Sequence, residues 1–431
     1  MDLKILPCSK ITGAITVPAD KSISHRAVML ASLSDGACNV DNLLESDDCM
    51  RTVECFRAMG TLIEKNDSGR YLVRGRGLKG LTAPRDILYV GNSGTSIRLL
   101  LGILAGQHFS ATITGDESIK QRPMKRVVDP LRKMGAVIRG RDNGNFAPLE
   151  IKGGELSAID YDLPVASAQI KSCLMLSALF AKGATRITEP SASRDHTERM
   201  FGYFGIPFSK EGNILSISSP GSIKSRDLSI PGDISSASFF IVAALIVPGS
   251  LLLIKDVGLN PTRTGILDVL KKMGARIEIK DTRELFGELR GNIIVESSKL
   301  RGVDIRGDII PKMIDEIPVL AVAAAYAEGT TIISDAQELK VKETNRIKTI
   351  AGELKKMGAL VEEKEDGLII DGGGGLMGAV CESHGDHRIA MSLAVAALAA
   401  EGETSVLNCD CISTSFPGFY GILKHITETG N

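Results

Sequence analysis

The segment Lys342–Arg346 (KETNR) concentrates basic and acidic side chains directly before an apolar helical pattern at residues 347–354. Thr344 or Asn345 could cap that helix, which places the segment at a helix N-terminus. Cations there oppose the helix dipole by about 0.3–1 kcal/mol, whereas the free N–H groups bind anions. Lys342 and Arg346 therefore favour a bound anion, although a solvated charged turn is the alternative for this segment taken alone.

The same kind of residue recurs at other predicted helix starts. If these N-termini face one cleft, their basic side chains build a cationic pocket for more than one anionic group. A set of isolated surface charges is the alternative, and the shared repeat position argues against it. The basic residues are Lys21, Arg26, Arg122, Lys342, Arg346 and Arg388.

A glycine-containing loop, Gly91–Thr95 (GNSGT), follows a strand-like run and opens an apolar helix. Its glycines let backbone N–H groups approach an anion. The loop lacks the Gly-Lys-Ser/Thr ending of a nucleotide-binding P-loop. We expect it to contribute to the same anion site.

Two carboxylates, Asp315 and Glu343, precede helices of one repeat. Beside a cationic pocket they could serve as separate proton-transfer groups, whereas for Asp315 an N-cap is the structural alternative. His387, flanked by Asp386 and Arg388, could relay a proton or make a structural hydrogen bond.

These residues are carried by an internal repeat. A helical run that ends in glycine and leads into a strand occurs six times, so each glycine is expected at a helix C-cap. A second helix then ends in a Met-Gly signature in four units and in a degenerate form in one, and the last unit lacks the glycine. The first glycines are Gly36, Gly106, Gly183, Gly249, Gly329 and Gly402.

Six helix/strand units of about 70 residues predict an α/β protein with two lobes of three units each. We expect chain crossings near residues 18–21 and 229–233, where Pro18 and Pro231 stand. This assigns residues 20–229 to an N-terminal lobe, and residues 1–19 with 230–431 to a C-terminal lobe.

Composition removes several classes of function. The net charge is −1 and aromatic residues make up 4% of the chain, which argues against nucleic-acid binding. The eight cysteines form no zinc pattern, and Cys409 and Cys411 are expected as reduced thiols in a strand. Without a signal peptide or a membrane-spanning stretch, we expect a cytoplasmic protein. A monomer is expected.

Several motifs, in order along nearly the whole chain, resemble those of the 5-enolpyruvylshikimate-3-phosphate synthase family. That resemblance implies two lobes of three repeats with helices inside a sheet shell, an inside-out α/β barrel. The motifs are Pro18–Arg26 (PADKSISHR), Gly91–Arg98 (GNSGTSIR), Lys120–Pro123 (KQRP), Asp233–Ser238 (DISSAS), Lys342–Arg346 (KETNR) and Asp386–Arg388 (DHR).

The resemblance implies addition–elimination between shikimate 3-phosphate and phosphoenolpyruvate, with release of phosphate and without metal or cofactor, in chorismate and aromatic amino-acid biosynthesis. It makes Asp315 the base for the 5-hydroxyl, Glu343 the acid for the methylene carbon, and Lys21 a stabiliser of charge. Shikimate 3-phosphate is expected on Ser22, Arg26, Ser167, Asp315 and Lys342. Phosphoenolpyruvate is expected on Lys21, Gly94, Arg122, Gln169, Arg346 and Arg388, with Asn92 a further binding residue.

Ala168 and Thr414 depart from the resemblance, because many members carry Ser and Lys there. The nearest alternative is a UDP-N-acetylglucosamine enolpyruvyl transferase, which would show Lys-Asn at Lys21 and Ser22 and a reactive cysteine within residues 113–126. Neither is present. A non-catalytic scaffold for phosphorylated ligands is the other alternative, and it gives Asp315 and Glu343 no purpose.

Overall fold

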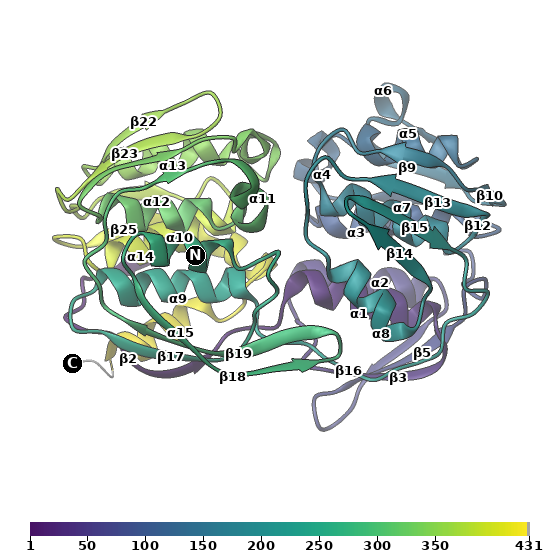
Figure 1. Cartoon of the computed structure of the whole chain (residues 1–431), viewed down its shortest axis with the longest axis horizontal. Coiled ribbons are helices and arrows are strands. Elements are labelled where there is room, and N and C mark those ends of the chain that lie inside the picture. The colour runs from purple at the N-terminus through teal and green to yellow at the C-terminus, as the bar shows by residue number, and fades with distance from the viewer. Residues whose placement is uncertain (429–431) are drawn as a thin grey trace. The chain divides into compact units, whose positions relative to one another are not determined.

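The computed structural model describes residues 1–428, which divide into two compact units, each with its own hydrophobic core. The N-terminal unit comprises Ala19–Ile230 together with the short segment Leu285–Glu288. The C-terminal unit comprises Met1–Pro18, Pro231–Glu284 and the chain from Leu289 onward. Figure 1 shows the N-terminal unit in purple to teal and the C-terminal unit mostly in green to yellow.

Within residues 19–230, one sheet pattern occurs three times: a parallel edge strand, a central pair of antiparallel strands and an antiparallel outer strand. The first sheet has the order β16 (Leu228–Ser229), β3 (Asp35–Asp41), β5 (Tyr71–Arg76) and β4 (Leu62–Lys65). The second has β6 (Leu88–Tyr89), β7 (Ser110–Thr114), β9 (Phe146–Lys152) and β8 (Val137–Gly140). The third has β11 (Asp160–Asp162), β13 (Ala184–Thr188), β15 (Ile214–Ser218) and β14 (Phe208–Glu211), and β10 (Leu156–Ser157) pairs with β12 (Ala181–Lys182).

The first helix of each repeat lies inside these sheets. α1 (Lys21–Leu33), α3 (Gly94–Ala105) and α7 (Ala168–Ala178) are buried on nearly every side, and α3 packs directly against α7. A helix that is apolar all round suits such a position. The other helices of the unit are α2 (Asp47–Ala58), α4 (Glu117–Gln121), α5 (Lys125–Lys133), α6 (Arg141–Gly144) and α8 (His196–Phe204).

The C-terminal unit repeats the plan. Up to residue 428, its first sheet has the order β18 (Arg276–Leu285), β19 (Glu288–Glu296), β17 (Leu251–Gly258) and β2 (Thr12–Thr16). The second has β20 (Asp304–Ile305), β21 (Gly329–Ile333), β23 (Leu368–Gly372) and β22 (Leu360–Glu363). The third has β1 (Leu3–Ile5), β25 (Thr404–Leu407) and β24 (Val380–Glu382). β2 and β1 come from the chain start, so the N-terminal residues complete two sheets of this unit.

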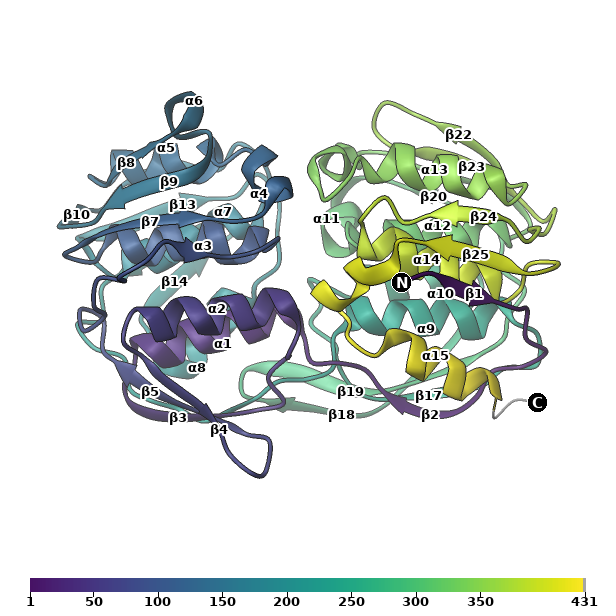
Figure 2. The ribbon, with the colours of Figure 1, turned by 180° about the vertical axis from the view of Figure 1, so that it is seen from behind.

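Its inner helices are α9 (Ile234–Ile246), α12 (Ile317–Ala325) and α14 (His387–Ala397), which pack against one another, as Figure 2 shows from behind. The remaining helices are α10 (Gly265–Lys272), α11 (Ile310–Met313), α13 (Arg346–Lys356), α15 (Phe419–Glu428), and the 3-10 turns η1 (Gly307–Ile309), η2 (Gln337–Val341) and η3 (Cys409–Thr414). The sheets enclose the helices, so the predicted α/β repeat architecture is confirmed. In residues 1–428 there is no helix with the length and apolar character that a membrane crossing requires.

Two local expectations need correction. Only Gly106 among the six repeat glycines is the helix C-cap; Gly36, for example, has a φ of +108° inside β3, where a strand begins after the helix. The Met-Gly glycines are the ones that end helices, because Gly60, with a φ of +88°, follows the C-cap Met59. Cys409 and Cys411 are free thiols, but they lie in η3 and not in a strand, because Asn408 turns the chain into the left-handed region.

Candidate active site

The start of α1 holds three of the predicted residues. Asp20 caps the helix by accepting a hydrogen bond from the N–H of Ile23 at 2.9 Å, which leaves Lys21 and Ser22 in the first turn. The ammonium of Lys21 lies 3.0 Å from the carboxylate of Asp48, a buried residue of α2. This pair gives Lys21 a fixed direction at the helix N-terminus.

Arg26, one turn further along α1, is buried and held on several sides. Its guanidinium donates to the hydroxyls of Thr197 and Ser172, each at 2.7 Å, and to the carbonyl of Ser22 at 2.9 Å. Those contacts tie α1 to α7 and α8. A guanidinium fixed in this way is suited to a phosphate or carboxylate ligand.

The start of α3 brings Asn92, Gly94 and Arg122 together. Arg122 donates to the side-chain oxygen of Asn92 at 2.6 Å, and Asn92 donates to Asp116 at 3.0 Å. A Cβ on Gly94 would lie 3.0 Å from a nitrogen of Arg98 and 3.2 Å from one of Arg122. A larger residue here would therefore push on two guanidinium groups that approach the backbone of Gly94. Arg122 lies between α4 and α5, rather than at the start of a helix.

Ser167 and Gln169 belong to the start of α7, where Ser167 is the N-cap. Gln169 accepts a hydrogen bond from Arg98 at 2.6 Å and donates to Thr95 at 3.2 Å, which connects α7 to the GNSGT loop. The sequence reasoning did not assign Arg98 a role. Its position four residues after Gly94, on the same helix face, is the signal that could have found it.

The C-terminal unit holds a second cluster around Arg346. This residue follows the N-cap Asn345 of α13 and its side chain is 1% exposed. Its guanidinium lies 2.8 Å from Asp386, 2.5 Å from Glu343 and 3.3 Å from Asp315. Burial alone would lower the pKa of Arg346, but the charges of Asp386, Glu343 and Asp315 raise it above its usual range. Arg346 thus stays charged and orients the carboxylates around it.

Asp315 lies between cations. Lys342 approaches its carboxylate at 3.2 Å and Arg346 at 3.3 Å, while Arg388 donates to its backbone carbonyl at 3.0 Å. Asp315 precedes α12 by two residues, and the N-cap of that helix is Glu316, so capping is not the role of Asp315. The capping alternative considered for Asp315 is thus removed, and its carboxylate is directed to the cations.

Asp386 was quoted in a motif but not assigned a role. It caps α14 by accepting from the N–H of Arg388 at 2.9 Å, and its two oxygens also bind Arg346. Thr344 donates to the same carboxylate at 3.2 Å. One buried carboxylate therefore sets the starts of α13 and α14 relative to each other.

The residues that depart from the resemblance have ordinary local positions. Ala168 is the first residue of α7, and Thr414 ends η3 with its hydroxyl 3.5 Å from the Nδ1 of His387. Thr414 also donates to the carbonyl of Cys411 at 2.7 Å, so His387 is the donor in their contact. This contact is the structural alternative considered for His387.

In the C-terminal unit, Asp315, Lys342, Glu343, Arg346 and Arg388 form one cluster. In the N-terminal unit the predicted residues lie in α1 (Lys21, Ser22 and Arg26), beside the start of α3 (Asn92, Gly94 and Arg122) and at the start of α7 (Ser167 and Gln169). We refer to these two sets as the C-terminal and the N-terminal cluster. That the two clusters share one cleft stays a prediction. Within residues 1–428, no three His, Cys, Asp or Glu side chains converge as a metal site would need.

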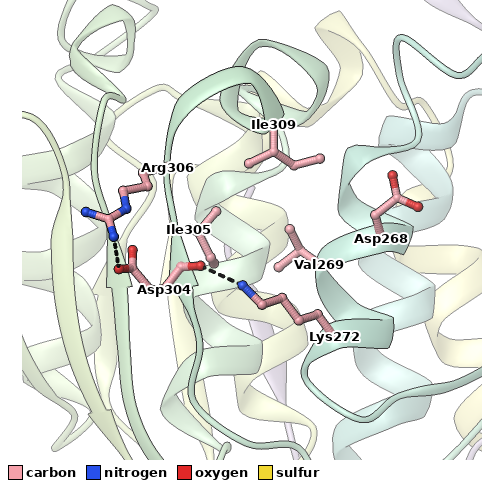
Figure 3. Close-up of a pocket in the computed structure, with 7 residues that line it drawn as sticks. All are labelled: Asp268, Val269, Lys272, Asp304, Ile305, Arg306 and Ile309. Atoms are coloured by element: carbon pink, nitrogen blue, oxygen red, sulfur yellow. Dashed lines mark hydrogen bonds and ion pairs between the residues drawn. The ribbon is translucent and has the colours of Figure 1, made fainter.

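A pocket of about 370 Å³ lies elsewhere in the C-terminal unit, between α10 and the β20–η1 segment, and none of its lining residues is a predicted site residue (Figure 3). Its cations are already engaged, because Lys272 donates to the carbonyl of Asp304 at 3.1 Å and Arg306 pairs with the carboxylate of Asp304 at 3.2 Å. We assign the pocket no role in the chemistry.

Comparison with known proteins shows the family of the chain. The sequence model of EPSP synthase (3-phosphoshikimate 1-carboxyvinyltransferase) matches residues 5–423. A 3-phosphoshikimate 1-carboxyvinyltransferase of Desulforamulus reducens is 53% identical over 426 residues, 99% of each chain, and one of Desulforudis audaxviator is 55% identical over 426 residues with the same coverage.

Solved structures agree with this match. EPSP synthase from Acinetobacter baumannii superposes with a TM-score of 0.89 at 43% identity, covering 99% of this chain and 98% of that one. The enolpyruvyl transferase NikO from Streptomyces tendae, at 18% identity, has a TM-score of 0.80 over 99% of this chain and 97% of that one, and supports the fold alone. The UDP-N-acetylglucosamine and scaffold alternatives are not favoured by these matches. The chain therefore belongs to the EPSP synthase family, the enolpyruvyl transferases of the shikimate pathway, and is an enzyme.

Proposed function

We propose that this protein transfers the enolpyruvyl group of phosphoenolpyruvate to the 5-hydroxyl of shikimate 3-phosphate and releases phosphate. The observation that carries the proposal is the Arg346 cluster. It holds two carboxylates, Asp315 and Glu343, on one buried guanidinium, within a chain that matches the family model over residues 5–423. Two separately placed carboxylates supply the base and the acid that an addition across a double bond requires.

The proposed binding roles are those that the family resemblance implies, and the charges and contacts of the residues support them. Ser22, Arg26 and Ser167 in one unit, with Asp315 and Lys342 in the other, bind shikimate 3-phosphate. Arg26 supports this role because Thr197 and Ser172 fix its guanidinium. Phosphoenolpyruvate is held by Lys21, Gly94, Arg122, Gln169, Arg346 and Arg388, with Asn92 orienting Arg122.

In the addition step, Asp315 takes the proton of the 5-hydroxyl as that oxygen bonds to C2 of phosphoenolpyruvate. The C2–C3 double bond opens, and C3 takes a proton from Glu343 to become a methyl group. Glu343 must first acquire that proton. When a substrate carboxylate occupies Arg346, it displaces Glu343 from the guanidinium, and a carboxyl beside a bound anion takes up a proton more readily.

Elimination reverses the proton flow. Glu343 removes a proton from the methyl group, the C2–C3 double bond reforms, and the C2–O bond to phosphate breaks. Asp315 gives its proton to the departing phosphate and becomes a carboxylate again. Lys21, at the α1 N-terminus beside Asp48, stabilises the negative charge that builds on the phosphate in both steps.

Phosphate release tests the proposal. Purified protein with shikimate 3-phosphate and phosphoenolpyruvate is expected to release phosphate, with and without EDTA, only when both substrates are present. Turnover with UDP-N-acetylglucosamine in place of shikimate 3-phosphate would move the protein to the alternative activity. Binding of either acceptor without turnover would favour a non-catalytic scaffold.

The protein is further proposed to act as a cytoplasmic monomer with small-molecule substrates and no nucleic-acid partner. The net charge of −1 supports the absence of a nucleic-acid partner, since it provides no broad positive field that would attract nucleic acid or an anionic membrane. Light scattering during size-exclusion chromatography checks the oligomeric state. A mass near 45.9 kDa is expected, and twice that mass would contradict it.

A further inference from the structure

A buried line of polar side chains connects the first three helices of the N-terminal unit. The Nδ1 of His25 in α1 lies 2.8 Å from the hydroxyl of Thr52 in α2, which lies 2.7 Å from the hydroxyl of Ser96 in α3. Ser96 in turn donates to the hydroxyl of Ser93, the α3 N-cap, at 2.7 Å. All these residues are at most 1% exposed. We name this set the hydroxyl line.

The direction of the hydrogen bonds along the line is determined. Each hydroxyl has one hydrogen, and that of Ser96 goes to Ser93, so the hydrogen between Thr52 and Ser96 must come from Thr52. Thr52 then has no hydrogen left for His25, so the Nδ1 of His25 is the donor, to Thr52 at 2.8 Å and at a longer 3.5 Å to Ser96. His25 is therefore the Nδ1–H tautomer, with its Nε2 an acceptor that has no hydrogen-bond partner in the described structure.

This direction does not depend on pH in the ordinary range. Burial, followed by the charges of Lys21 and Arg26, lowers the pKa of His25 to about 3, and Asp20 opposes this only in part. A neutral ring carries only one N–H, so the tautomer and the hydrogen bonds stay fixed together.

The line joins the elements that carry the proposed phosphoenolpyruvate ligands. α1 bears Lys21, α2 bears Asp48, which pairs with Lys21 at 3.0 Å, and Ser93 sets the first turn of α3 immediately before Gly94. We propose that the hydroxyl line positions the α3 start relative to Lys21 and thereby determines the affinity for phosphoenolpyruvate. The proposal rests on the function and ligand roles proposed above.

The other substrate is expected to depend less on this line. Arg26, a proposed shikimate 3-phosphate ligand, is held by Ser172 on α7 and Thr197 on α8, which are separate anchors. Thr52, Ser96 and His25 act through Lys21 and Gly94, so they are positioning residues and not catalytic ones.

The chain offers a matched control. Thr185 of β13 is also a fully buried threonine of the N-terminal unit, but its hydroxyl has no hydrogen-bond partner in the described structure. Replacement of Thr185 by Val removes the same atom from the same kind of core without breaking a line between helices. Thr52→Ser, in turn, keeps the hydroxyl and loses only a methyl group.

The test compares Thr52→Val, Thr52→Ser, Ser96→Ala and Thr185→Val by steady-state kinetics with both substrates. For Thr52→Val and Ser96→Ala we expect the KM for phosphoenolpyruvate to rise about threefold to tenfold, the size of effect of one lost buried hydrogen bond. The KM for shikimate 3-phosphate should stay within about twofold, and Thr52→Ser should restore the wild-type value. Thr185→Val should match wild type.

Equal changes in both KM values, or a Thr52→Val enzyme with unchanged KM for phosphoenolpyruvate, would overturn the positioning role. A second readout is independent of turnover: nitrogen NMR of the His25 ring should show the Nδ1–H tautomer in the wild-type protein, and the Nε2–H tautomer would overturn the line. If the wild-type protein shows the Nδ1–H tautomer but has no activity, the proposed function is contradicted and the hydrogen-bond direction along the hydroxyl line is not.

Discussion

Arg346 shows how single residues set the chemistry of the site. A guanidinium of 1% exposure can be tolerated only because Asp386, Glu343 and Asp315 surround it. Of these carboxylates, Asp386 is fully buried, whereas Glu343 and Asp315 are 19% and 14% exposed. Asp386 is therefore the most enclosed partner of Arg346, and the proposed function requires that Glu343 exchange with a substrate anion.

Replacement of Glu343 by Gln tests its role as the acid for C3. The amide keeps the shape of the side chain but has no proton to transfer, so we expect a loss of at least ~10²-fold in kcat. Binding of shikimate 3-phosphate, followed by calorimetry, should be nearly unchanged. Glu362→Gln, at an exposed position of β22 in the same unit, is the control and should keep full activity. A near-normal kcat for Glu343→Gln would remove Glu343 from proton transfer.

His25 predicts a pH dependence of stability. Because its folded-state pKa is lowered to about 3, the unfolded state binds the proton first as pH falls below its ordinary value of 6.5. The contribution of neutral His25 to the free energy of unfolding is therefore fully present above pH 6.5. It is lost as the pH falls toward 3, by up to about 1.4 kcal/mol per pH unit. Urea unfolding of wild type and His25→Asn measures the difference. The variant should lose less stability between pH 6 and 4 (roughly the window of the shift) than wild type. Equal losses would contradict the assignment, and the exposed His108→Asn serves as control.

At the scale of elements, a buried ion cluster ties α7 to α8. Lys171, with a side chain of 0% exposure, lies 2.6 Å from Glu198 and 3.0 Å from Glu189. Glu189 also accepts hydrogen bonds from the backbone and hydroxyl of Ser193. The cluster sits next to Ser172 and Thr197, the residues that orient Arg26. It therefore supports the binding side of the site without contacting it.

Replacement of Lys171 by Met would leave two buried carboxylates without their cation. We expect a loss of about 3–5 kcal/mol in the free energy of unfolding, the usual effect of breaking a buried pair from one side. Lys182→Met is the control, because its partner Glu155 is exposed and such a pair contributes under about 1 kcal/mol. Urea denaturation measures both. Similar losses for the two variants would mean that the Lys171 cluster is not structural.

Helix starts were the best predicted elements. Asn345, one of two candidates, is the cap of α13; Asp20 and Asp386 cap α1 and α14 with the same kind of short polar side chain, although no cap was predicted at either residue. The pairing of Arg98 with Gln169 could not be predicted, because it depends on α3 packing against α7, a contact between residues 71 positions apart. The prediction that all six repeat glycines are helix C-caps was wrong for a related reason. A glycine in the left-handed region can end a helix or begin a strand, and the local sequence does not distinguish the two.

The segment Leu285–Glu288 was equally beyond local sequence reasoning. It connects β18 to β19 of the C-terminal unit but packs as part of the N-terminal unit. There Glu288 lies 2.7 Å from the ring of His196, and Phe286 packs edge-on against Tyr203. Such contacts join residues about 90 positions apart, and no periodicity in the sequence signals them.

For the whole molecule, repetition explains the site. Each unit encloses three buried helices in sheets, and most of the proposed ligand residues lie at or near the polar starts of helices. The N-terminal cluster is rich in cations and hydroxyls, while the C-terminal cluster adds the proposed acid and base, Glu343 and Asp315. The proposed addition–elimination reaction therefore requires protonation of C3 of phosphoenolpyruvate during turnover.

Turnover in D2O tests that requirement most directly. With shikimate 3-phosphate and phosphoenolpyruvate, we expect deuterium at C3 of the enolpyruvyl product, because addition puts a solvent-derived hydron on C3 and elimination removes one of three from the methyl group. Mass spectrometry of the product measures it. A product formed at the normal rate without deuterium at C3 would contradict addition–elimination and the role of Glu343.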